Sequence, residues 1–204
     1  MTRLLILVLA LAAVWFYLSR PAPLQLEAPP PIIALEAPSV DDPPVQQSLD
    51  QPNNFKLKNY EIQTLQAFAL TARVLSVETY KLGREADLSP LDIAFGWGRM
   101  RDSAVVDRLS ISQSGRWYHW RYSGEPPLPR REIETSSANM HMIPASAEVA
   151  KALHKLGKGT IVSLRGYLVQ AKANDGWTWR SSLTREDTGN GSCELVFVQA
   201  VDIH

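Results

Sequence analysis

The sequence predicts an α+β fold: a small, mainly antiparallel β domain with two or three short helices, preceded by an N-terminal transmembrane helix. Three observations carry this prediction: an uncharged apolar run at the N-terminus, a proline-rich stretch after it, and alternating apolar and polar segments between turn residues in the remainder. An OB-like, partly closed barrel is the specific expectation, because such a barrel hides the edges of a twisted antiparallel sheet. An open antiparallel sheet covered by the helices is the alternative.

Length and charge leave room for one ordinary domain and provide no global electrostatic attraction. The chain has 204 residues, of which 45% are hydrophobic, which is enough for one buried core. Lys plus Arg and Asp plus Glu number 21 each, so no net field favours nucleic acid or an acidic partner. We therefore expect nucleic acid as a partner only if the folded domain lies in the cytoplasm.

Residues 1–20 predict a membrane anchor. The run from 4 to 18 is apolar and uncharged, with Arg3 and Arg20 on either side of it. We expect this run to contact the lipid bilayer as a single uncleaved span, with the folded domain outside the cytoplasm. A cleaved signal peptide is the alternative, although the small-x-small cleavage pattern is missing where it should lie.

Residues 21–53 predict a disordered, extended tether. They hold most of the chain's 14 prolines, together with acidic residues and no lysine or arginine. Such a composition disfavours helices and sheet ladders. Ile32, Ile33 and Leu35 form a candidate docking patch within this tether.

Residues 54–204 predict the globular domain. Ser89 and Pro90 are typical of a helix start, so we expect a first helix after Ser89, a second near 103–109 and a third behind Ser146. The C-terminal third predicts a meander of strands, with a turn at Asn190-Gly191. The expected strands cover residues 55–62, 66–80, 109–122, 160–171, 176–183 and 193–203.

Residues 115–122, GRWYHWRY, concentrate aromatic and basic side chains. In a strand, successive side chains point to opposite faces. One face then carries Trp117, His119 and Arg121, and the other carries Arg116, Tyr118, Trp120 and Tyr122. One face is expected to pack in the core and the other to be exposed.

Three short stretches combine tryptophan with arginine and form the candidate binding surface. Aromatic side chains on strand faces of OB-type barrels stack against bases or sugars. The surface requires the three stretches to meet in space, and a packing role is the alternative for each tryptophan. The candidate ligand-binding residues are Trp97, Arg99, Trp117, Arg121, Trp177, Trp179 and Arg180.

Metal and nucleophile chemistry have weaker signals. Met140, His141 and Met142 are soft donors, but strand alternation would place His141 on the face opposite the methionines. We therefore expect no metal and no cofactor. Cys193 is the single cysteine and begins an apolar strand, so we expect an inert thiol; catalysis by Cys193 with a histidine is the alternative.

Four strings in the folded domain resemble an uncharacterised family of bacterial membrane-anchored proteins with no assigned activity. They are LSPLDIAFGWGRM, ISQSGRWYHWRY, SSANMHMIPAS and GWTWRSSLTREDTGNGSCE, and the resemblance covers most of the chain from about residue 68 onward. It implies a bacterial source, and it transfers no activity, cofactor or catalytic residue.

The sequence therefore predicts a noncatalytic binding or assembly module of the bacterial cell envelope. We expect a single-pass protein of the inner membrane, with a periplasmic domain that recognises a protein or glycan partner. An envelope hydrolase using Cys193 with a histidine is the first alternative. A nucleic-acid-binding OB-like domain is the second, and it requires a cytoplasmic location.

Overall fold

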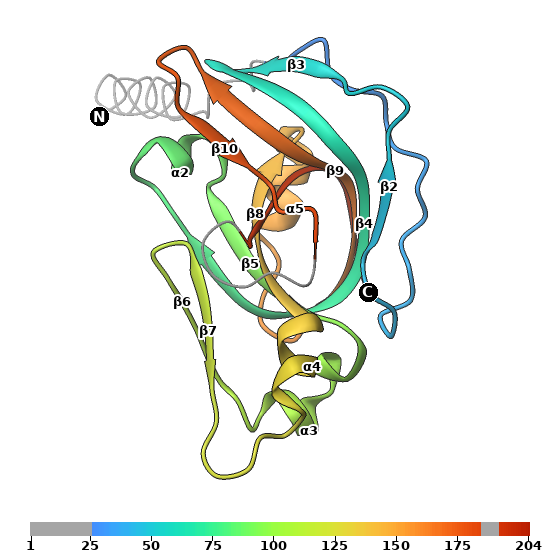
Figure 1. The fold of residues 1–204 in the computed structure, drawn as a ribbon, viewed down its shortest axis with the longest axis vertical. Coiled ribbons are helices and arrows are strands. Elements are labelled where there is room, and N and C mark those ends of the chain that lie inside the picture. Colours follow the sequence, from blue (N-terminus) through green and yellow to red (C-terminus); the bar gives the residue numbers. More distant parts are fainter. Residues whose placement is uncertain (1–25, 185–191) are drawn as a thin grey trace, which may run out of the picture.

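The computed structural model describes residues 26–184 and 192–204, which form a mainly antiparallel β structure with four short α-helices (Figure 1). The predicted α+β class is confirmed, with four short α-helices in these residues where two or three were expected. The predicted anchor, residues 1–20, lies outside the described residues. In the described part of the chain, no helix is long and apolar enough to cross a membrane.

Most strands belong to one large sheet, and the separate β6–β7 hairpin projects beyond it (Figure 1). The elements are β1 (Leu26–Glu27), β2 (Val45–Ser48), β3 (Asn54–Leu57), β4 (Tyr60–Thr79), α2 (Arg84–Leu88), β5 (Leu91–Gly96), the 3-10 helix η1 (Gly98–Arg101), α3 (Ser103–Val106), β6 (Ser110–Ser114), β7 (Trp117–Arg121), α4 (Arg130–Thr135), β8 (Ser137–Pro144), α5 (Ala147–Leu153), β9 (Ile161–Ala173), β10 (Thr178–Arg180) and β11 (Glu194–Ile203).

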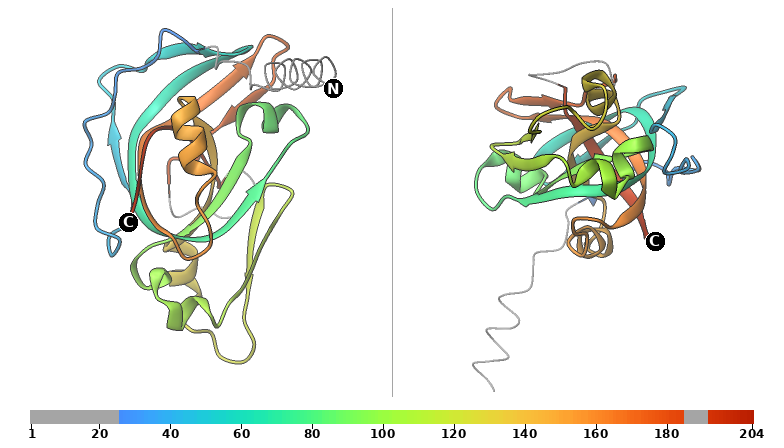
Figure 2. Two further views of the ribbon diagram at one scale, coloured as in Figure 1. Left: turned by 180° about the vertical axis from the view of Figure 1, so that it is seen from behind. Right: turned by 90° about the horizontal axis from the view of Figure 1, so that it is seen from below.

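Five strands of the large sheet close into a ring. Their order is β4-β5-β8-β11-β9, and β9 pairs again with β4 over most of its length, so the two curved strands run side by side (Figures 1 and 2). Neighbouring strands are antiparallel except β8 and β11, which are parallel. The C-terminal third is therefore not the predicted meander, because β11 lies between β9 and the earlier strand β8.

The inside of the ring is the main apolar core. Phe68, Leu70 and Val74 alternate along β4 and point inward, where they meet inward side chains from the other four ring strands. Leu153 at the end of α5 belongs to the same core, so α5 covers one end of the ring. The predicted helix behind Ser146 is confirmed.

The prediction of a helix after Ser89 is wrong. Residues Leu91–Gly96 form β5, and all six are buried because β5 lies between β4 and β8. Ile93 and Phe95 point into the ring core. The Ser-Pro start signal is local, whereas pairing with two distant strands decides the conformation of this segment.

The prediction of an extended tether is also corrected for residues 26–53, which pack on the ring rather than away from it. The hydroxyl of Tyr167 donates to the carbonyl oxygen of Pro31 at 3.0 Å, and the Ile33 amide donates to the Gln199 side chain at 3.1 Å. β2 pairs with β4, and Ile33 and Leu35 pack against a second apolar core on the outside of the ring. Apolar burial and hydrogen bonds fix this segment despite its prolines.

The chain between β5 and β8 forms a separate body beside the ring (Figure 1). It contains η1, α3, the β6–β7 hairpin and α4 around a third apolar core, and α3 begins at Ser103 as predicted. The predicted continuous strand 109–122 is interrupted, because Gly115 and Arg116 turn the chain with φ values of +57° and +72°. Within β7 the exposure alternates as predicted, with Trp117 and Arg121 on the exposed side.

A close approach between β9 and β11 yields a prediction about Gly166. A Cβ atom at Gly166 would lie 1.9 Å from the backbone oxygen of Phe197, so Gly166→Ala must separate β9 from β11. We expect a loss of about 3 kcal/mol or more in the free energy of unfolding, measured by urea denaturation.

Gly157 is the matched control, because a Cβ atom there meets nothing within 4 Å. Gly157→Ala should leave the unfolding transition almost unchanged. Equal stability of the two variants would contradict the tight β9–β11 contact.

Candidate functional site

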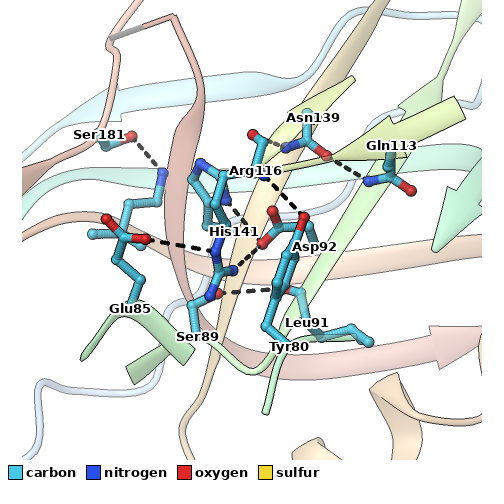
Figure 3. Close-up of polar contacts among 11 residues, drawn as sticks. Tyr80, Glu85, Ser89, Leu91, Asp92, Gln113, Arg116, Asn139, His141 and Ser181 are labelled. Carbon is cyan, nitrogen blue, oxygen red and sulfur yellow. Dashed lines mark hydrogen bonds and ion pairs between the residues drawn. The ribbon is translucent and has the colours of Figure 1, made fainter. Parts of the chain in front are cut away.

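The candidate site lies on the outer face of β5 and β8. Asp92 of β5 and His141 of β8 are direct cross-strand partners. Met140 and Met142 point into the ring core, so His141 points the opposite way, as strand alternation predicts. Figure 3 shows the Asp92 and His141 side chains converging with Arg116 from the hairpin turn.

Asp92 is the centre of this group. Its side chain is fully buried, and Oδ1 accepts a hydrogen bond from Nη1 of Arg116 at 2.6 Å. The same oxygen lies 2.9 Å from Nδ1 of His141. A buried carboxylate without partners costs several kcal/mol, so these two basic groups are what makes a charge tolerable here.

Arg116 is held from several directions. Its guanidinium lies 3.8 Å from the centre of the Tyr80 ring, and its backbone amide donates to the Tyr80 hydroxyl at 2.9 Å. Its carbonyl oxygen accepts from the Asn139 side chain at 3.1 Å, and Asn139 also accepts from Gln113 at 2.7 Å. These contacts fix the tip of the β6–β7 hairpin on the ring (Figure 3).

His141 is buried and enclosed on several sides. The Trp179 ring lies 4.8 Å from it between centres, and Asp92 and Cys193 make polar contacts with it. Burial by itself would lower the pKa of His141, but the contacts with Asp92 and Cys193 outweigh burial and raise that pKa to about 9. His141 is therefore an imidazolium at neutral pH.

Cys193 is half-buried and forms no disulfide. Its carbonyl oxygen accepts from the Ser182 amide at 3.1 Å, and the Leu195 amide donates to the Ser181 hydroxyl at 3.1 Å. The segment after β10 thus fixes the start of β11 and, with it, the position of the thiol.

A groove of about 640 Å³ runs between the β6–β7 hairpin, α4 and the start of β11. Cys193 lines it, and so do Trp120 and Tyr122, whose rings stack 6.1 Å apart at 16° between planes. Arg130 lies over the Trp120 ring and pairs with Glu134 at 2.8 Å. The groove therefore combines flat aromatic faces with charges of both signs.

The structure brings together part of the predicted binding surface. Trp117 and Arg121 are exposed in the groove, while Trp97 borders the groove but is only 2% exposed. Arg99 lies outside the groove and pairs with Glu132 at 3.3 Å.

The other predicted residues lie on or beside β10. Trp177 and Trp179 contact each other at 6.1 Å and pack against the second apolar core. Trp179 approaches His141 from this side, and Arg180 donates to Gln170 at 2.5 Å. Neither tryptophan lines the groove, so the three stretches do not form one continuous surface.

Sequence reasoning did not identify Asp92, Arg116 or Tyr80 as site residues. A usable signal was present for Asp92, which is the one charge in the run LDIAFGWG. Had this run been interpreted as a strand, a carboxylate in it would have required a basic partner.

Among residues 26–184 and 192–204, no group of three or more His, Cys, Asp or Glu side chains is placed to hold a metal ion. Comparison with protein-family models, with curated proteins and with solved structures gave no match.

The Arg116–Asp92 pair yields a stability prediction. Arg116→Met leaves the buried carboxylate with one partner fewer and releases the hairpin tip, so we expect a loss of about 3 kcal/mol in the free energy of unfolding. Arg121→Ala, on the exposed side of the same hairpin, should change it by less than about 0.5 kcal/mol. Similar losses in both variants, measured by urea denaturation, would contradict an anchoring role for Arg116.

His141 yields a prediction about pH. A group whose pKa is higher in the folded than in the unfolded state stabilises the fold fully below its unfolded pKa, and this contribution is lost as the pH rises through the folded pKa. The pKa of His141 is raised from its ordinary value of 6.5 to about 9. Raising the pH across that range should therefore lower the free energy of unfolding by roughly 3 kcal/mol.

Urea denaturation at a series of pH values measures this loss. His141→Gln should flatten the dependence between pH 6.5 and 9, whereas His119→Gln, an exposed histidine on β7, should preserve it. An unchanged slope in His141→Gln would show that another group is responsible.

Proposed function

We propose that this chain is a membrane-tethered binding module of the bacterial cell envelope, and that the groove beside the β6–β7 hairpin receives a glycan or protein partner. The observation that carries the proposal is the groove itself, about 640 Å³ in volume and lined by the Trp120–Tyr122 stack and by exposed Trp117 and Arg121. Ligand sites typically have this size and combine apolar faces with a few polar groups.

The proposal includes an OB-like barrel. The ring order β4-β5-β8-β11-β9, the parallel β8–β11 pair and a helix between β8 and β9 support it. Barrels of this kind bind oligosaccharides or oligonucleotides on the face of their second and third strands and the adjoining loops. Here that face belongs to β5 and β8, where Asp92 and His141 lie beside the groove.

The character of the groove favours a glycan over nucleic acid. Aromatic faces pack against the C–H faces of sugar rings, and Asn139, Thr135 and Glu134 supply hydrogen-bonding groups for sugar hydroxyls among the lining residues. The positive charges of Arg121 and Arg130 are offset by acidic neighbours, and the whole chain has no net charge. Nucleic acid binding depends on an excess of positive charge.

The envelope location is part of the proposal and depends on the apolar run at residues 4–18. With its flanking arginines, the run is suited to an uncleaved inner-membrane anchor. A periplasmic domain would meet cell-wall glycans and envelope proteins, which agrees with the mixed polar and aromatic groove.

The binding proposal is tested with Trp117→Ala in the full-length chain. We expect this variant to bind soluble cell-wall glycan fragments at least about fivefold more weakly than the wild type, because loss of one stacked aromatic ring costs on the order of 1–3 kcal/mol. Isothermal titration calorimetry measures the affinity, and thermal unfolding should be unchanged.

Leu82→Ala is the control, because Leu82 is 91% exposed and lies outside the groove. It should bind like the wild type. Equal affinity of Trp117→Ala and the wild type would remove the groove from the binding site, and absence of glycan binding by the wild type would leave a protein partner as the ligand class.

A further inference from the structure

We infer that Cys193 is a nucleophile that accepts an acyl group from an ester or amide bound in the groove, with His141 as its proton donor and acceptor and Asp92 as the positioning residue. This inference rests on the proposed function in one respect, because the acyl ligand must occupy the same groove. The reaction itself goes beyond binding.

Strand register places the thiol beside the imidazole. β11 runs parallel to β8 with Glu194 opposite Met140 and Leu195 opposite His141. Cys193 precedes this ladder by one residue and therefore lies next to Asn139, with the same facing as His141 and Leu195. The position of the Cys193 thiol is therefore set by the pairing of β8 with β11 and by the Ser181 and Ser182 contacts that fix the start of β11.

The histidine is oriented toward the thiol. Nδ1 of His141 lies 2.9 Å from Oδ1 of Asp92, and the imidazole also contacts the side chain of Cys193. Trp179 packs against the ring from β10, and the histidine is only 3% exposed. A nucleophile, a base within reach and a third group that orients the base are the arrangement required for nucleophilic catalysis.

Burial is distributed as the reaction requires. Asp92 and His141 lie behind the groove wall, whereas Cys193 is half-buried and lines the groove. A ligand can therefore reach the sulfur while water is kept from the carboxylate and from most of the imidazole. Cys193 thus lines the groove and also contacts the histidine that is paired with Asp92, whereas an inert core cysteine needs neither contact.

The proposed reaction balances with water as the second reactant. The thiolate sulfur attacks the carbonyl carbon, a C–S bond forms, and the C–O or C–N bond breaks as His141 gives its proton to the leaving alcohol or amine. Water then attacks the thioester, and His141 takes the proton back. The C–S bond breaks, the carboxylic acid leaves, and the thiolate and imidazolium are restored. The raised pKa of His141 supports its role as the proton donor in the first step.

Charged groups on every side of the thiol contribute to its environment. Those behind it are His141, Asp92 and Arg116, and those along the groove are His119, Arg121, Arg130, Glu134 and Glu194. Any pH profile of the reaction therefore reports the whole group and is compared between variants.

The test uses the activated ester 4-nitrophenyl acetate with the full-length chain in detergent micelles. We expect one 4-nitrophenolate per chain in a rapid first phase and an acetyl group on Cys193, identified by peptide mass spectrometry. The first-phase rate should exceed that of the same chain unfolded in urea by at least about 100-fold, the effect typical of a positioned acid or base. A folded rate equal to or below the unfolded rate would overturn the inference without any variant.

Variants assign the roles. His141→Gln should lower the acylation rate about 100-fold and Cys193→Ser should abolish it, while the control His154→Gln, at an exposed histidine outside the groove, should react like the wild type. Asp92→Asn should slow acylation at least tenfold and also lower the pKa of His141 measured by NMR in the folded protein, whereas partial unfolding alone would slow acylation and leave that pKa unchanged. Unchanged acylation in His141→Gln would show that the Cys193–His141 contact is structural.

Failure of this inference is distinguishable from failure of the binding proposal. Acylation is measured on Cys193 by mass spectrometry and glycan binding by calorimetry, so the wild-type chain gives the two results separately. Glycan binding without acylation would overturn the nucleophile and preserve the binding module. Acylation without glycan binding would preserve the nucleophile and overturn the glycan as its ligand.

Discussion

The face of the ring is organised by one buried carboxylate. Asp92 meets Arg116 on one side and His141 on the other, and both contacts use the same oxygen atom. In a low-dielectric interior a charge so placed requires its partners, so the partners are constrained as strongly as the carboxylate. The hairpin turn and the orientation of the imidazole thus both depend on a side chain from the middle of β5.

The groove is shaped by how two bodies meet. The ring supplies β8 and the start of β11, and the chain between β5 and β8 supplies the hairpin and α4. This second body is fixed at two places. At its base its apolar core packs against Leu75 of β4 and Ala94 of β5, and at the other end Arg116 holds the hairpin tip on the ring. Because both ends are fixed, the aromatic wall between them keeps its distance from Cys193.

Local patterns predicted those parts of the fold that local forces determine. The alternation of β4 and β7 and the cap at Ser146 were readable because they depend on neighbouring residues. The strand β5 was not, because its Ser-Pro start resembles a helix and only pairing with β4 and β8 makes it a strand. Residues 26–53 were predicted as a tether because of their prolines. They pack on the ring through apolar side chains and single hydrogen bonds, and composition alone does not predict such contacts.

The candidate site was predictable only in outline. The pairing of Cys193 with a histidine was an alternative in the sequence, but four histidines were available, and only the parallel β8–β11 register selects His141. Asp92 and Arg116 lie 24 residues apart on different elements, and a turn with positive φ brings them together. No spacing rule links such residues, whereas the tryptophan pair of β10 was visible because its members are two residues apart.

The docked N-terminal segment has a consequence for where the groove can work. β1 already pairs with β3 at Leu26, so only residues 21–25 separate the proposed anchor from the ring. Five extended residues span no more than about 20 Å. If residues 1–20 lie in the bilayer, the domain is held against the membrane surface and samples only a thin shell above the lipid. Its partner must then be found in that shell.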